Sequence, residues 1–129
     1  MSAPECIETR HPNGALKSRE YFEHGKFHNT SGPAMEEWND KGVLTRCAHY
    51  EDGALHRTLG PAVENWNNKG VLIRRAFFEH GKLHNTSGPA DEYWNHKGNL
   101  MRRKFWVDDV QLSEDEFNAR AATKSAYKQ

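Results

Sequence analysis

The sequence predicts a mainly β protein: a single elongated antiparallel β-meander built from repeats, with a short C-terminal helix. The strongest indication is an internal repeat, because residues 23–34 return at 79–90 with a single change, Phe27 to Leu83. Three tryptophans keep the same spacing of 28 residues, at Trp38, Trp66 and Trp94. A fixed period of this length is typical of repeat architectures. Between the turn residues the side chains alternate with period two, which indicates strands.

About three full units can be aligned, at residues 22–49, 50–77 and 78–105. A half unit precedes them, because Gly14, Leu16 and Phe22 match the positions 28 residues later. A second half unit follows at 106–109, where Asp109 replaces the turn glycine and the pattern is expected to stop. We therefore expect three segments, an N-terminal stretch at 1–9, a β-repeat domain at 10–112 and a capping helix with tail at 113–129.

The composition excludes several classes of protein. Acidic and basic residues balance at 18 each, which argues against a duplex DNA binder and a polybasic membrane anchor. The mean hydropathy of −0.98 fits a thin repeat array better than a thick core. No apolar run predicts a membrane span, and residues 1–10 do not resemble a signal peptide. With two cysteines in non-equivalent repeat positions, we expect free thiols and a cytoplasmic location, the host cytoplasm if the gene is phage-encoded.

The turn at residues 39–42 suggests a strand register. A type I turn that ends on a left-handed Gly42 places Asn39 opposite Val43. Trp38 then faces Leu44 and Glu36 faces Arg46, an apolar pair beside an ion pair. The same register gives the pairs Ala34–Ala48, Trp66–Leu72, Glu64–Arg74, Ala62–Ala76, Trp94–Leu100 and Glu92–Arg102.

The second part of each unit is less certain in its strand count. Residues 54–56 are expected to pair back onto 48–50 as a short strand, which leaves two or three strands per repeat open. The prolines Pro33, Pro61 and Pro89 are expected at strand starts or on the rim, since proline donates no amide to a ladder. The middle unit has Arg57-Thr58-Leu59 where the other two have Asn-Thr-Ser, so this loop is expected to bend or face a different environment.

After Leu112 the pattern changes to that of a helix. Ser113 and Glu116 form a capping-box signature, with acidic residues in the first turn. We expect this helix to cap the open end of the array, as the terminal units of repeat proteins require.

These residues resemble the MORN-type repeats, in the variant with Gly-Lys-Leu-His, Gly-Pro-Ala and Trp/Tyr-x-x-x-Gly that is frequent in phage, giant-virus and bacterial proteins. The resemblance covers about residues 10–112, and residues 112–117 resemble the terminal cap of that group. It implies an extended antiparallel sheet that serves as a scaffold, a dimerisation surface or a binding module, including for membrane lipid.

The repeated histidines invite a metal interpretation, at His24, His28, His56, His80 and His84. A zinc site needs three or four ligands that converge. Because these histidines recur with the repeat, the rise between units holds them apart. We expect each ring to stack on its neighbour and bond a turn carbonyl, and we expect neither a metal nor another cofactor.

Cys47 and His49 share a strand face and could form a nucleophile with its base. No third orienting group or oxyanion donor accompanies them, and arginine stands at the Cys47 position in later units. A small packing residue is the better interpretation of Cys47. The repeated glycines are turn glycines, since no strand–helix context of a phosphate loop follows them. We therefore predict a non-enzymatic protein.

The opposite face of the hairpins diverges between units and is the predicted partner-binding surface. In the second and third units it would gather apolar side chains flanked by arginines, the types enriched in protein interfaces. The predicted residues are Ile73, Arg75, Phe77, Tyr93, Met101, Arg103 and Phe105. A single-layer sheet needs either a partner or the C-terminal helix over such a patch.

The predicted function is a protein–protein interaction module. By resemblance it would be a phage or mobile-element protein that blocks a host factor by occlusion, such as an anti-CRISPR inhibitor. Open sheet edges also favour a homodimer. The alternative is a scaffold that binds nucleic acid or lipid through the basic–aromatic stretches at 74–75 and 102–104. If Glu64 and Glu92 pair with Arg74 and Arg102, few free cations remain for that role.

Overall fold

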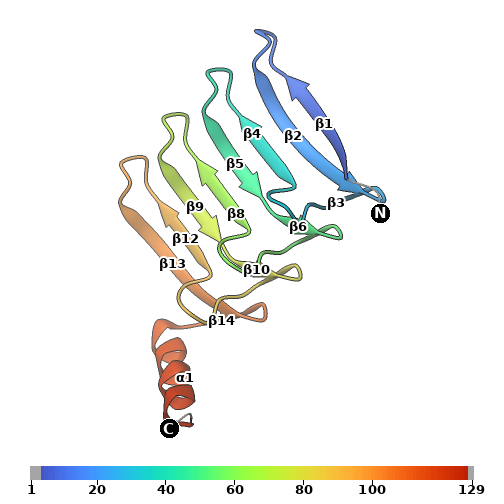
Figure 1. Cartoon of the computed structure of the whole chain (residues 1–129). Helices are drawn as coiled ribbons and strands as arrows, with labels where there is room; N and C mark the ends of the chain where they lie inside the picture. The colour runs from blue at the N-terminus through green and yellow to red at the C-terminus, as the bar shows by residue number, and fades with distance from the viewer. Residues whose placement is uncertain (1–3, 128–129) are drawn as a thin grey trace.

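A computed structural model describes residues 4–127 as one large antiparallel sheet with a helix at its end, which confirms the predicted fold class (Figure 1). Within these residues the sheet has ten strands. Nine follow one another in space as they do along the chain: β1 (Glu5–Arg10), β2 (Leu16–Glu23), β4 (Met35–Trp38), β5 (Leu44–Ala48), β8 (Val63–Trp66), β9 (Leu72–Ala76), β12 (Asp91–Trp94), β13 (Leu100–Val107) and β14 (Val110–Leu112). The tenth, β3 (Lys26–Phe27), pairs with the end of β2.

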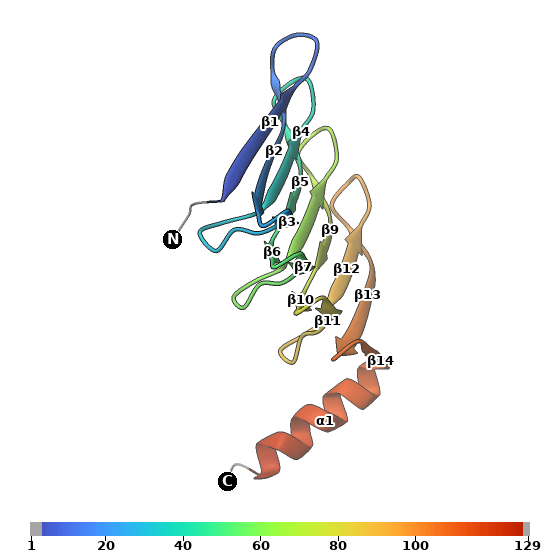
Figure 2. The ribbon, with the colours of Figure 1, turned by 90° about the vertical axis from the view of Figure 1, so that its right-hand side faces the viewer.

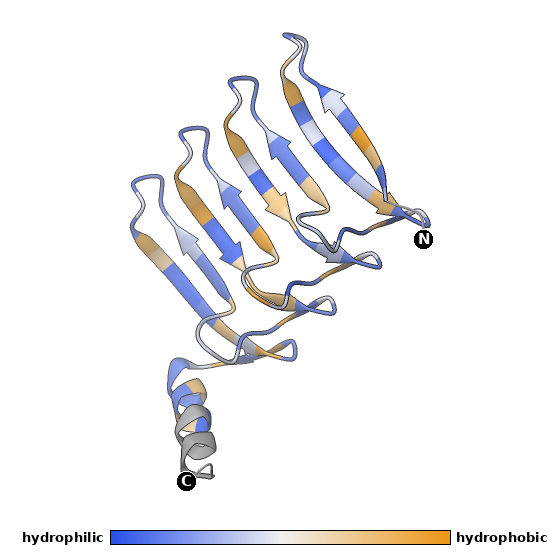
Figure 3. Ribbon diagram, viewed as in Figure 1, coloured by the Kyte–Doolittle hydropathy of each residue, from blue (hydrophilic) through white to orange (hydrophobic). Residues whose placement is uncertain are grey.

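Each repeat adds a short hairpin to its long one, so a complete unit has four strands and not the two or three that the sequence left open. The short hairpins are β6 (Tyr50–Glu51) with β7 (Ala54–Leu55), and β10 (Phe78–Glu79) with β11 (Lys82–Leu83). Figure 2 shows them leaving the plane of the long strands on one side. The turns at the ends of the long hairpins are hydrophilic, and apolar residues lie in separate patches along the strands (Figure 3).

The two faces of the sheet differ because the short hairpins cover only one of them. On this inner face Ala48, Val63 and Ala76 form a buried row that runs across three strands. Side chains of the short hairpins pack against the row, with Met35 beside them: Tyr50, Leu55, Phe78 and Leu83. Residues one position away along each strand point to the opposite, outer face.

A bulge in every long hairpin corrects the predicted register. The pairs nearest the turn are confirmed: Trp38 lies opposite Leu44, and Gly42 has a left-handed φ of 86°. The register then shifts by one residue between Glu37 and Trp38, as an inserted bulge residue requires. Equivalent shifts precede Arg10, Trp66 and Trp94, while the Trp66–Leu72 and Trp94–Leu100 pairs are also confirmed.

The predicted charge pairs beyond the bulge are therefore wrong. Arg46, Arg74 and Arg102 lie opposite Glu37, Asn65 and Tyr93, not opposite Glu36, Glu64 and Glu92. The predicted alanine pairs also separate, because Ala48 and Ala76 lie opposite Met35 and Val63. Since a shift of one residue exchanges the two faces, Glu36, Glu64 and Glu92 belong to the outer face.

The array is longer at both ends than the sequence indicated. Strand β1 falls in the expected N-terminal segment, and its Glu8 and Arg10 stand 28 residues before Glu36 and Trp38, so the first hairpin is a complete unit. At the other end, Asp109 adopts the left-handed φ of 68° that a glycine has elsewhere. Its amide still donates to the Leu83 carbonyl at 2.9 Å, so the pattern continues through β14.

Three histidines connect successive units through their Nδ1 atoms. His28, His56 and His84 each accept a hydrogen bond from a turn amide of the next short hairpin, at 2.9–3.0 Å. The predicted contact to a turn carbonyl is thus wrong, and the bonded group is an N–H. The predicted stacking is found for His56 on His80, with ring centroids 4.3 Å apart. In each case Nε2 faces a carboxylate of the same unit, at 3.1–3.7 Å.

Helix α1 (Glu114–Tyr127) begins with the predicted capping box. The Glu116 amide donates to Ser113 Oγ at 3.1 Å, and the Ser113 amide donates to Glu116 Oε1 at 2.9 Å. The helix packs on the end of the array through Phe117, whose ring lies 4.7 Å from that of Phe105. In the described part of the chain, no helix is long and apolar enough to cross a membrane.

Replacing His28 with Asn should destabilise the protein by about 1–2 kcal/mol, because the shorter side chain leaves the Asp52 amide without its acceptor. His24→Asn is the matched control: its side chain is 86% exposed and asparagine tolerates its positive φ. Urea unfolding of both variants measures the difference. Equal stabilities would show that the Nδ1 bond does not connect the units.

Candidate functional site

The outer face carries a row of alternating charges that crosses the whole sheet. Register pairing brings one residue from each long strand into line. In spatial order this charge row is Glu8, Arg19, Glu36, Cys47, Glu64, Arg75, Glu92 and Arg103, and Glu114 of α1 follows it. Glutamates come from the first strand of each hairpin and arginines from the second, so the repeat itself builds the row.

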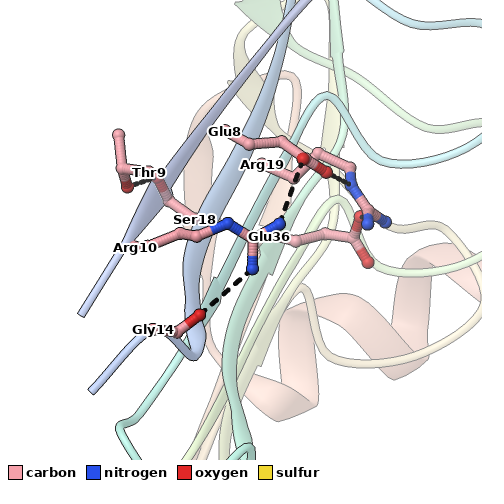
Figure 4. Close-up of polar contacts among 7 residues, drawn as sticks. All are labelled: Glu8, Thr9, Arg10, Gly14, Ser18, Arg19 and Glu36. Carbon is pink, nitrogen blue, oxygen red and sulfur yellow. Dashed lines mark hydrogen bonds and ion pairs between the residues drawn. The ribbon is translucent and has the colours of Figure 1, made fainter. Parts of the chain in front are cut away.

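Ion pairs join much of the charge row. Arg19 donates to Glu8 at 2.9 Å, and its guanidinium also lies 3.8 Å from Glu36. Figure 4 shows this first part of the row, with Glu8 and Arg10 reaching toward each other. Further along, Arg75 donates to Glu92 at 2.5 Å. Opposite charges on adjacent strands stabilise a sheet and leave the face close to neutral.

Cys47 interrupts the row where an arginine would stand. Burial raises the pKa of its thiol to about 11, and the carboxylates of Glu64 and Glu36 add to that effect. Its nearest titratable neighbour is His49, with Nε2 at 4.0 Å from Sγ. Burial, together with the charge of Arg57, lowers the pKa of His49 to about 4.

These two shifts oppose thiol chemistry at Cys47. A nucleophilic cysteine needs a lowered pKa, and its histidine partner needs to hold a proton. Here both shifts favour the neutral pair. The geometry therefore supports the interpretation of Cys47 as a buried packing residue.

Below the charge row, aromatic rings alternate with alanines. Backbone hydrogen bonds between neighbouring strands define this aromatic row, which consists of Tyr21, Ala34, His49, Ala62, Phe77, Ala90 and Phe105. The three alanines have no exposed surface. This aromatic row supports the sheet at the level where the chain bends into the short hairpins.

Above the charge row lies a row of large apolar side chains, which we call the tryptophan row. It consists of three register pairs, Trp38–Leu44, Trp66–Leu72 and Trp94–Leu100. Arginines of the charge row lie over two of its rings, Arg19 at 5.6 Å from Trp38 and Arg75 at 5.5 Å from Trp94. These cation–π contacts fix the indole orientation. The tryptophans remain half-exposed, and Leu100 is 47% exposed.

Of the seven predicted partner-binding residues, Arg75 and Phe77 share the outer face, where the Arg75 guanidinium lies 5.8 Å from the Phe77 ring. Ile73 and Met101 are the residues that the bulges of β9 and β13 leave without a register partner on the preceding strand. Tyr93 lies on the inner face, where its hydroxyl donates to Asp91 at 3.3 Å. This separation follows from the bulge, which exchanges the faces of β12 relative to the predicted register.

Helix α1 contacts the other two predicted residues. Phe105 is buried beneath Phe117, and Arg103 donates to Glu114 at 2.6 Å. Sequence reasoning had named the helix as one possible cover for this patch. It missed the tryptophans and Glu36, Glu64 and Glu92 as members of the same face. The signal was present, since these residues and the arginines all recur at 28 residues.

Three loops at the foot of the outer face enclose shallow grooves. Asn29 and Asn85 each donate through Nδ2 to the carbonyl of the proline four residues on, at 3.0 Å. In the middle loop Arg57 performs this role, donating to Pro61 at 3.1 Å. The loop keeps its closure but projects Leu59, which is 90% exposed between grooves of about 440 and 630 Å³.

Within residues 4–127, no three histidine, cysteine, aspartate or glutamate side chains converge in a way that could hold a metal ion. Comparison with protein-family models, curated proteins and solved structures finds no match for the chain. The MORN-type resemblance therefore stays a prediction. What the chain offers for function is the outer face itself.

Cys47→Arg should stabilise the protein by about 0.5–1 kcal/mol, because it supplies the cation missing between Glu36 and Glu64. Cys47→Leu fills similar space without charge and serves as the control. Thermal and urea unfolding of the three proteins measure the effect. A gain in the leucine variant equal to that in the arginine variant would show that packing, not charge, limits this position.

The stability of the protein should fall as pH is lowered from about 6.5 to about 4. In this window the unfolded His49 binds a proton that the folded one, with its lowered pKa, does not. His49→Phe removes this dependence and uses the residue found at positions 77 and 105. Urea unfolding at about pH 7.5 and about pH 5 should show a smaller loss in the variant. Equal losses would assign the pH dependence to other groups.

Proposed function

We propose that this chain is a non-catalytic module that binds a partner protein through the tryptophan row of its outer face. The carrying observation is that this row lies on a sheet face without a second layer in the described structure, while the short hairpins pack on the inner face around Ala48, Val63 and Ala76. Half-exposed tryptophans and their leucine partners form a strip across three hairpins.

The chemistry of the strip is that of a protein interface. Tryptophan, methionine and arginine are enriched at interface centres, and tryptophan and arginine are enriched among the residues that contribute most of the binding energy. The arginines beneath the strip already hold Trp38 and Trp94 in place. A partner would therefore meet anchors that lose little side-chain entropy on binding.

The charges on this face favour a protein over a nucleic acid. Arg19, Arg75 and Arg103 are each bound to a glutamate, and Arg74 of the inner face makes two bonds to Asp91 at 3.1 Å. A phosphate backbone would have to displace these carboxylates before it gained a contact. We keep nucleic acid as the alternative outcome of the test.

The mode of action in this proposal is occlusion. The repeat holds the outer face as one extended surface, so binding would cover a wide area of the partner without chemistry. If the phage-type resemblance holds, the partner is a host factor that the module blocks. The resemblance alone supports that last step.

Photo-crosslinking can locate the binding face. A photoreactive amino acid at Leu100 should crosslink the partner, whereas the same group at Arg102 should not. Both positions lie on β13, but Leu100 is the register partner of Trp94 on the outer face and Arg102 that of Tyr93 on the inner face. Crosslinks from Arg102 alone would place the contact on the inner face and contradict the proposal.

With the captured partner purified, Leu72→Asp and Leu100→Asp should each weaken binding by about tenfold or more, as the loss of an interface anchor does. Arg102→Asp is the matched control and should leave the affinity unchanged. Calorimetric titration measures all three, and circular dichroism verifies their fold. Unchanged affinity in both outer-face variants, or salt-sensitive binding of single-stranded oligonucleotides in place of protein, would overturn the proposal.

A further inference from the structure

Both lateral edges of the sheet are open in the described part of the chain. Strand β1 pairs only with β2, and all six of its residues are exposed. At the other end β14 pairs with β13 only at residues 105–107, so residues 100–104 have a strand neighbour on one side, β12, and an open edge on the other. Open edges offer unpaired backbone groups to another strand.

We propose that β13 of one copy of this chain pairs with β1 of a second copy, which joins copies head to tail. The register is that of the internal junctions, which place Arg19 opposite Glu36, Cys47 opposite Glu64 and Arg75 opposite Glu92. Glu8 stands 28 residues before Glu36, and Arg103 stands 28 after Arg75. The next junction in this series places Arg103 opposite Glu8 of the second copy.

Backbone geometry fits this pairing. The Ala90 amide donates to the Lys104 carbonyl, so the backbone polar groups of Lys104 point toward β12 and those of Arg103 point toward the open edge. The Tyr21 amide donates to the Ala34 carbonyl, so the backbone polar groups of Tyr21 point away from its register partner Cys6. The backbone polar groups of Cys6 therefore point toward the open edge, and so do those of Glu8 two residues on. Arg103 and Glu8 thus both present free N–H and C=O groups in the required alternation.

Charge selects the unlike edges over like ones. The free edge of β13 carries Arg102, Arg103 and Lys104, so two such edges would repel each other in an antiparallel pair. Two β1 edges would offer Glu8 only Arg10 of the other copy, and Arg10 already lies 3.7 Å from the Glu8 of its own chain. Only the head-to-tail arrangement extends the alternation of the charge row across the junction.

The junction can form with α1 in place. Each internal junction between long hairpins consists of three register pairs, so residues 102–104 and 7–9 suffice for a junction of equal size. Glu114 would compete for Arg103, since both side chains are half-exposed and already paired. We therefore expect a weak, concentration-dependent association. A heterologous contact of this kind forms open chains unless its rotation closes a ring.

Sedimentation velocity from micromolar to millimolar protein tests the inference. The average mass should rise with concentration in the natural sequence, and Glu8→Arg and Arg103→Glu should each weaken association by about tenfold or more, through like charges at the junction. Asp40→Arg makes the same charge change as Glu8→Arg at an exposed hairpin turn and should associate normally.

Mixing the two single variants is the decisive step. The mixture should regain association, because each copy then meets an opposite charge at both ends. This recovery also excludes misfolding as the cause of either loss. A monomer at all concentrations, or a mixture that stays dissociated, would overturn the inference. Association lost in Glu8→Arg but intact in Arg103→Glu would indicate symmetric pairing of two β1 edges instead. Because the junction residues 7–9 and 102–104 lie outside the tryptophan row, this result is independent of partner binding.

Discussion

The short hairpins folded against the inner face supply the burial that a single-layer sheet lacks. Their apolar side chains close over the row of Ala48, Val63 and Ala76, and the histidine bonds attach each hairpin to its neighbour. Small residues in the row allow the hairpins to approach the sheet closely. Because this core lies wholly on one side, the outer face is free of a packing duty above the level of the bend, and its side chains can serve recognition.

The repeat length, the strand and turn positions, the left-handed Gly42 and the capping box could be predicted from the sequence, since each depends on local chemistry. The register beyond the turn could not. A turn fixes only the pairs next to it, and a bulge leaves no distinctive residue to reveal it. Strand β1 escaped notice because Arg10 replaces the tryptophan that marks the other hairpins. Aligning Glu8 with Glu36 would have recovered it.

The candidate surface also contains residues whose position the sequence predicts and residues whose position depends on the register or on tertiary contacts. Arg75 and Phe77 were assigned to one face because both lie beyond the bulge along the chain, where the alternation of side chains is uninterrupted. The bulges leave Ile73 and Met101 without register partners and place Tyr93 opposite Arg102 on the other face. Phe105 was lost to α1, a tertiary contact that no periodicity reports. The charge row, in contrast, is visible in the sequence once the bulge is known.

The helix cap makes the two ends of the array unequal. Helix α1 covers Phe105 and Val107 at one end, whereas β1 has every residue exposed and pairs only with β2 in the described sheet. In a stack whose units are stabilised by their neighbours, unfolding starts where a unit has one neighbour and no cap. Thermal opening is therefore expected to travel from the N-terminal hairpin toward the helix, which gives an array of near-identical units a direction.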